Sequence, residues 1–261
     1  MALKLAPIVV TEAGFGADLG AEKFLDIKCR VGNLKPDAVV MVATIRALKL
    51  HGGVKFEELE GENVEALKIG VANLKRHLEN IKKYDVPVVI CINHFESDSE
   101  AETKALEEFC KENNYEVAYS DAFSKGAKGA VELAKLVMRT LETKQSHYHP
   151  LYELDKSYKE KIETICKEIY RAGKVEYTDV ALEQLEKYEK LGYKNLPVCI
   201  AKTPLSFTDN AKVLNAPDDF TVTIREVRLS AGAGFLVALT GSIMTMPGLP
   251  KVPAAVKMQE K

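Results

Sequence analysis

Two short segments combine glycine, aromatic and polar residues in patterns that can bind ligands. The first, which we call the glycine turn, has five consecutive residues: Gly14, Phe15, Gly16, Ala17 and Asp18. It follows the apolar run Pro7–Val10, which we expect to be a buried strand, and it precedes a helix. Such a turn exposes backbone N–H groups that can bind phosphate or carboxylate. The dinucleotide fingerprint GxGxxG is not matched, because Leu19 stands where the third glycine is required.

The second segment, Cys91–Glu100, begins at the end of the apolar run Pro87–Ile92. Its aromatic residue Phe95 has a counterpart in Phe123, which follows the next apolar run, Tyr115–Tyr119. If both runs are adjacent parallel strands, the two rings lie at the same edge of a sheet. Two facing rings can hold a flat heterocycle by stacking, with a gain of about 1 kcal/mol per ring. The alternative is that Phe95 only packs over the sheet edge.

Several charged residues near these segments allow two interpretations. Lys125 and Lys128 follow Phe123 and can meet an anion, or they can be solvated lysines before a helix. Arg46 and Lys49 can pair with phosphates, or they can lie on an exposed helix face. Asp18 can meet a ligand amine, but helix capping is the commoner use of an aspartate at such a place. The histidines have no spacing typical of zinc ligands, so we expect no metal site.

The remaining pattern predicts an α/β protein with open, mostly parallel sheets and flanking helices. Apolar runs at Ala38–Ala43, Pro87–Ile92 and Tyr115–Tyr119 predict buried strands. Helices are expected between them: Asn63 can cap one that continues to Ile81, Ser99 and Glu102 form a capping box for another, and Ala130–Leu141 is a third.

The pattern changes near Gln145–Pro150, where no periodic face is present. Beyond it we expect two helices and two strands, at Ser157–Tyr170, Asp179–Leu191, Val198–Ala201 and Phe220–Leu229. These elements predict a smaller C-terminal α/β domain from about residue 151. The glycines and prolines near the C-terminus, in 230–236 and 245–253, are interpreted as a domain or subunit interface rather than a ligand site.

The composition excludes several classes of protein. The 261 residues carry a formal net charge of −2, without the basic excess of a sequence-independent nucleic-acid binder. No apolar run approaches the roughly 18 residues of a membrane span. The five cysteines are scattered and never in CxxC spacing, which favours a reduced, cytoplasmic protein without structural zinc.

Four blocks of the sequence resemble the formate–tetrahydrofolate ligase family: Thr11–Arg30, Pro36–Gly53, Asn93–Gly129 and Val227–Ala255. The resemblance implies an ATP-dependent carbon–nitrogen ligase of one-carbon metabolism. In that family formate is phosphorylated to formyl phosphate, and N10 of tetrahydrofolate then attacks the formyl group. The implied substrates are tetrahydrofolate, formate and ATP, with magnesium and, as a further option, a monovalent cation in the complete enzyme. A homo-oligomer is also implied.

The resemblance assigns roles to both segments. An asparagine–x–phenylalanine segment and a later aromatic clamp the pterin in the family, and Asn93 and Phe95 match the first part. Phe123 falls where we associate tryptophan with the family, and this chain has no tryptophan; Glu96 replaces a proline. A clamp of two phenylalanines offers less stacking area. The glycine turn is expected to line the nucleotide site, with Phe15 against the base or ribose.

The family's phosphate cradle, a P-loop in its N-terminal half, has no match here, because GxxxxGK followed by Ser or Thr does not occur. We therefore expect a C-terminal fragment or split-gene product: residues 1–74 a remnant of the large nucleotide-binding domain, 75–150 the folate-clamp domain, and 151–261 the smaller domain. No catalytic residue is expected in this chain. Alone it would be inactive and bind no cofactor tightly, and its partner would be the missing N-terminal half. The alternative is a non-catalytic folate-binding or interaction module. A nicotinamide-dependent oxidoreductase fits poorly because of Leu19.

Overall fold

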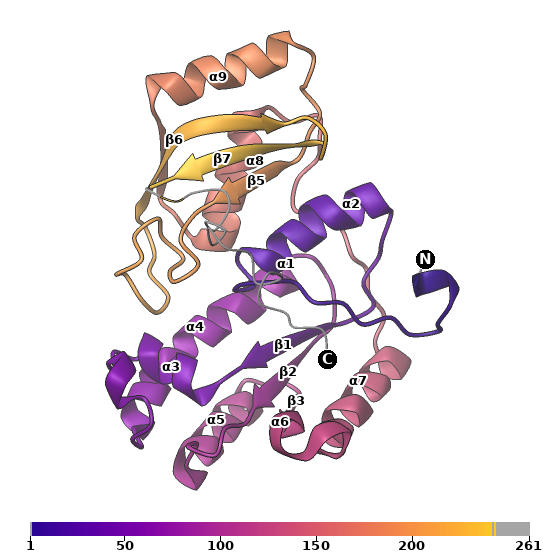
Figure 1. Cartoon of the computed structure of the whole chain (residues 1–261), viewed down its shortest axis with the longest axis vertical. Coiled ribbons are helices and arrows are strands. Elements are labelled where there is room, and N and C mark those ends of the chain that lie inside the picture. Colours follow the sequence, from indigo (N-terminus) through magenta and orange to yellow (C-terminus); the bar gives the residue numbers. More distant parts are fainter. Residues whose placement is uncertain (1, 242, 244–261) are drawn as a thin grey trace, which may run out of the picture.

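Three of the apolar runs form a parallel sheet. The structure, a computed structural model, describes residues 2–241 and 243. Sheet A has the order β1-β2-β3, with β1 at Val39–Ala43, β2 at Val88–Asn93 and β3 at Val117–Ser120. Val42 is opposite Cys91, and Asn93 is opposite Ser120. The three predicted strands and their parallel arrangement are confirmed (Figure 1).

Helices connect and cover these strands. They are α3 (Ile45–His51), α4 (Val64–Lys82), α5 (Glu100–Glu112), α6 (Ala122–Lys125) and α7 (Val131–Thr143), with 3-10 turns η1 (Ala2–Lys4), η3 (Phe56–Glu58) and η4 (Gly126–Ala130). The predicted caps are present: the Asn63 side chain accepts a hydrogen bond from the Ala66 N–H, and Ser99 and Glu102 form the capping box. Polar residues at these positions satisfy backbone groups that a helix end leaves without partners.

A second sheet, sheet B, has the order β4-β6-β7-β5. Its strands are β4 (Lys174–Tyr177), β5 (Val198–Ala201), β6 (Thr221–Ser230) and β7 (Phe235–Thr240), and only β6 and β7 are antiparallel. The helices are α8 (Tyr158–Ile165), continued by the π-helix η5 (Cys166–Tyr170), and α9 (Asp179–Lys190). The α/β class of this part is confirmed. The strands β4 and β7 were not predicted, and the segment 245–253 lies outside the described residues.

The predicted strand Pro7–Val10 is wrong. These residues are exposed and belong to no strand or helix, and β1 pairs only with β2 in the described part of the chain. An apolar run becomes a strand only where another strand can receive its hydrogen bonds. The helix that follows is present as α1 (Gly20–Lys23), the π-helix η2 (Phe24–Lys28) and α2 (Cys29–Gly32). Asn33, with φ +47°, ends it.

One cluster of buried apolar side chains runs from Leu25 to Ala238 and includes residues of both sheets. The boundary expected at 74/75 falls within α4, and the pairing of β1 with β2 crosses it. The boundary expected at 150/151 lies between α7 and α8. The division into domains stays a prediction. Among the described helices, none has the length and apolar character to cross a membrane.

Candidate functional site

The glycine turn is held tightly against the start of its helix. Leu19 and Gly20 donate backbone hydrogen bonds to the Gly16 carbonyl, at 3.0 and 2.8 Å. A Cβ atom on Gly20 would lie 1.7 Å from the Gly14 carbonyl oxygen, so the turn requires glycine there. Phe15 has φ +62°, an unusual conformation for a bulky residue, and its side chain is 76% exposed. The ring of Phe15 is therefore free to meet a ligand.

Asp18 is not the cap of this helix. The N-cap is Leu19, without a side-chain hydrogen bond. Asp18 is only 4% exposed, and its Oδ2 lies 2.7 Å from Nζ of Lys202. The capping prediction is therefore wrong, because a buried carboxylate needs an opposite charge more than the helix end needs this side chain.

Lys202 was not among the residues predicted from the sequence. It follows β5 directly and is 3% exposed. Besides Asp18, its Nζ donates to the Thr203 carbonyl at 3.1 Å and to the Ser206 carbonyl, so each of its three N–H bonds has an acceptor. Burial lowers the pKa of Lys202, and the Asp18 carboxylate opposes this shift. A lysine after a short strand resembles an ordinary surface residue, so the sequence carried no signal of this pairing.

His77 of α4 packs between the glycine turn and the segment around Phe207. Its ring lies 4.7 Å from the ring of Phe207, between centroids, and its Cε1 lies 3.6 Å from where a Cβ on Gly16 would be. The same Cβ would lie 2.6 Å from Asp18 Oδ1. Burial lowers the pKa of His77 to about 4, so the imidazole is neutral at pH 7. The turn, α4 and the Phe207 segment are thus packed together.

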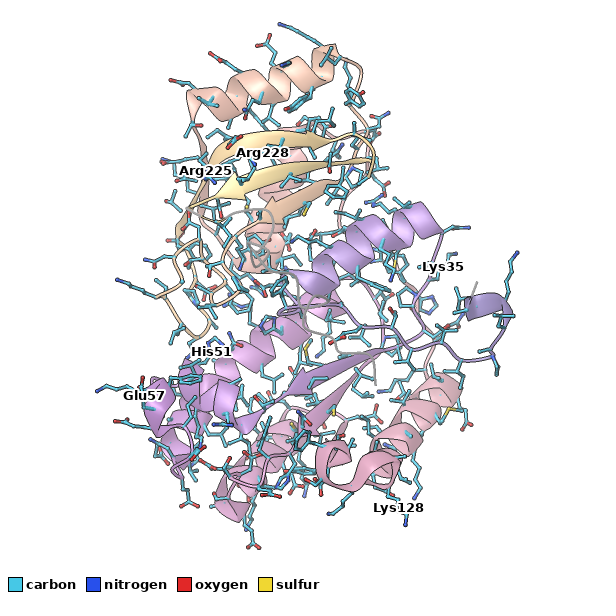
Figure 2. The ribbon with its side chains drawn as sticks, in the orientation of Figure 1. Lys35, His51, Glu57, Lys128, Arg225 and Arg228 are labelled. Carbon is cyan, nitrogen blue, oxygen red and sulfur yellow. The ribbon has the colours of Figure 1, made fainter. Side chains whose placement is uncertain are left out.

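The 202–220 loop, which connects β5 to β6, covers the polar face of α4. Arg76 donates to the Pro217 carbonyl at 3.1 Å and to Asp218 Oδ1 at 2.9 Å, and Asn73 donates to the Asn215 carbonyl at 2.8 Å. The Asn215 N–H donates to Nδ1 of His51 at 3.0 Å, and Figure 2 labels His51 at the end of α3 on the side of this loop. Long irregular connections in compact domains are often functional.

The second candidate region, the aromatic rim, consists of Asn93, Phe95 and Phe123. Asn93 ends β2 opposite Ser120, the last residue of β3, so both phenylalanines lie beyond the carboxyl ends of adjacent parallel strands. Phe95 is 37% exposed, and Phe123 is 96% exposed on α6. In the described part of the chain the two rings do not stack on each other. The edge of sheet A thus presents two separate rings to solvent.

The charged residues near the rim are mostly paired. Lys49 is buried, with Nζ 2.9 Å from Glu102 Oε1 and 2.8 Å from the Gly61 carbonyl, so the interpretation of an exposed helix face is wrong for it. Arg46 lies 3.5 Å from Glu60. Lys125 pairs with Asp121 at 2.6 Å.

Lys128 is exposed and projects away from the body of the molecule in Figure 2. Within the described residues, no group of three or more His, Cys, Asp or Glu side chains could hold a metal ion.

A comparison with known protein families finds a match. The family described as formate–tetrahydrofolate ligase matches residues 1–261, the full length of the sequence. A match of this extent includes the glycine turn, the aromatic rim and the 202–220 loop. The chain belongs to the formate–tetrahydrofolate ligase family.

Proposed function

We propose that this chain is the folate-binding part of a formate–tetrahydrofolate ligase, which formylates N10 of tetrahydrofolate through formyl phosphate. The observation that carries the proposal is the aromatic rim of a chain that matches the family throughout. Phe95 and Phe123 contribute little to the core, yet they lie where open parallel sheets bind ligands. Both exposed rings can then bind the pterin of tetrahydrofolate by stacking on its two faces.

The glycine turn is proposed as one wall of the nucleotide site. Its exposed Phe15 ring suits contact with a base or ribose. Its charges do not suit phosphates, because Asp18 and Lys202 neutralise each other in a buried pair. The glycine turn therefore suits the nucleoside end of ATP better than its triphosphate with magnesium.

The phosphate cradle must then come from a second polypeptide segment. Phosphoryl transfer requires backbone N–H groups, a lysine on the β and γ phosphates and a magnesium ion. The printed sequence contains no P-loop motif. We propose that the N-terminal half of the ligase supplies the cradle and that this chain by itself does not make formyltetrahydrofolate.

The second candidate is a non-catalytic folate-binding or interaction module. The exposed rings of Phe95 and Phe123 also favour this module, since they can bind a pterin whether or not the formyl transfer takes place. The two candidates differ only in whether a P-loop partner restores the reaction.

A complementation assay separates the candidates. The purified chain is incubated with ATP, magnesium, formate and tetrahydrofolate, alone and with the separately expressed N-terminal half of a family member. We expect no formyltetrahydrofolate from the chain alone and a steady signal from the mixture. No product from the mixture, together with tetrahydrofolate binding by the chain, would favour the non-catalytic module. Product from the chain alone would contradict the need for a second segment.

We further propose that the protein acts in the cytoplasm and forms a homo-oligomer. Exposed apolar side chains on the edge strand β1, Val40 and Val42, and in the N-terminal segment, such as Leu5 and Val10, support association. Sedimentation velocity of the chain tests this, and a monomer at every concentration would contradict it.

A further inference from the structure

The Phe95 ring has a cation over one of its faces. The guanidinium carbon of Arg46 lies 5.6 Å from the centroid of the ring. Both residues stand just beyond adjacent strands, since Arg46 is near the start of α3, which follows β1, and Phe95 follows β2 (Figure 1). A guanidinium placed in this way is attracted by the ring and can stack on it.

The backbone beneath Arg46 is firmly placed. Thr44 caps α3 by accepting a hydrogen bond from the Ala47 N–H at 3.2 Å. Ile45 is completely buried and anchors the first turn in the core. Among the described residues, the Arg46 guanidinium pairs with the Glu60 carboxylate at 3.5 Å, and the guanidinium is partly exposed while the carboxylate is largely exposed. Such a pair is worth little, so it does not draw Arg46 away from the ring.

The backbone of Phe95 is also fixed. Its N–H donates to Oδ2 of Asp98 at 2.9 Å, and the Asp98 N–H donates to the Phe95 carbonyl at 2.9 Å. With the backbone held, the Phe95 ring can change its position only by rotation about its side-chain bonds. A group on one face of the ring limits these torsions and leaves the opposite face open. Phe123 is different, because at 96% exposure its ring has almost no protein contact.

We propose that Arg46 is a positioning residue of the folate clamp: it supports Phe95 from one face, so that the pterin stacks on the other. The inference rests on the proposed function and assigns Arg46 a role that does not require contact with the ligand. Phe95 is then the half of the clamp that is ordered before folate binds, and Phe123 is the half without such support.

The test compares Arg46→Met, which keeps an unbranched apolar stem but removes the charge and the planar group, with Arg46→Lys. Arg139→Met is the matched control, because Arg139 is a more exposed arginine of α7 that pairs with Glu116 at 3.2 Å. Each variant is titrated with tetrahydrofolate and with tetrahydropteroate, which lacks the glutamate. Phe95→Ala is titrated in parallel, and circular dichroism verifies that each variant is folded.

We expect Arg46→Met to weaken the binding of both ligands equally, by about two- to fivefold, as the loss of an exposed cation–π contact predicts. Arg46→Lys should lose less, and Arg139→Met should bind like the parent. If Arg46→Met binds both ligands like the parent while Phe95→Ala loses affinity, the inference is wrong and the clamp stands. A loss confined to tetrahydrofolate would also overturn it, because Arg46 would then pair with the glutamate carboxylate. If the parent binds neither ligand, the clamp and the inference both fail.

Discussion

The glycine turn and the aromatic rim are built in opposite ways. The turn is closed by buried contacts between distant parts of the chain, with Asp18 paired to Lys202 and Gly16 packed beside His77. The rim consists of exposed rings, with only local support for Phe95. The buried contacts of the glycine turn stabilise the fold, whereas the rings of the aromatic rim lie on the surface and contribute little to it. Changes in the turn should act first on stability, and changes in the rim first on ligand binding.

The largest expected effect is that of Lys202→Met. Removal of the ammonium leaves the buried Asp18 carboxylate without its partner, and breaking one side of a buried ion pair costs about 3–5 kcal/mol. Urea denaturation measures the loss in the free energy of unfolding. The double variant Asp18→Asn with Lys202→Met should recover most of it, since no charge is then left unpaired. Parent-like stability of Lys202→Met would show that the pair does not hold the turn.

A smaller loss is expected for Gly20→Ala. The added methyl group would meet the Gly14 carbonyl oxygen, a backbone atom that cannot move without opening the turn. Overpacking of this kind costs about 1–3 kcal/mol. Gly232→Ala is the control, because nothing lies within 4 Å of its Cβ position. Equal unfolding midpoints for both variants would contradict the close packing of the turn.

The pH dependence of stability tests the buried carboxyl group of Glu22, in the helix that follows the turn. Burial raises the pKa of Glu22 to about 8, outweighing the attraction of the Lys23 ammonium 3.3 Å away. Between the unfolded value near 4.5 and this value the folded state holds more protons, so the free energy of unfolding falls as pH rises through that window. Each pKa unit between the two states corresponds to about 1.4 kcal/mol.

Glu22→Gln cannot titrate and should therefore show a weaker decline between pH 5 and 8 in denaturant titrations. The same decline in parent and variant would mean that Glu22 is not the group responsible.

The rim was more accessible to sequence reasoning than the turn. Its strands are apolar runs, its helix starts carry recognisable caps, and the position of Phe95 and Phe123 beyond adjacent strands follows from local patterns. The family resemblance added the pterin as ligand.

The pairs Asp18–Lys202 and Lys49–Glu102 could not be predicted, because each depends on how distant segments are assembled. The run Pro7–Val10 is the opposite case, in which a local pattern predicted a strand that the structure does not contain. Its β-branched residues favour a strand, but no neighbouring strand in the described residues pairs with it. The short strand β4 was missed for a related reason, because four residues of alternating exposure carry too little pattern to recognise.

The smallest change in stability and the clearest change in binding are expected at the rim. Phe123→Ala removes an almost fully exposed ring and should unfold within about 0.5 kcal/mol of the parent. Phe95→Ala removes a ring that is 37% exposed and contacts Arg46, so it should lose about 1 kcal/mol of stability and stay folded. Each should lose about 1 kcal/mol of binding free energy for tetrahydrofolate, about fivefold in affinity.

Fluorescence titration of the parent, the two single variants and the double variant with tetrahydrofolate is the most direct test of the folate clamp. We expect the parent to bind tetrahydrofolate and both single variants to bind it more weakly without loss of folding. Parent-like affinity in the double variant would contradict the clamp.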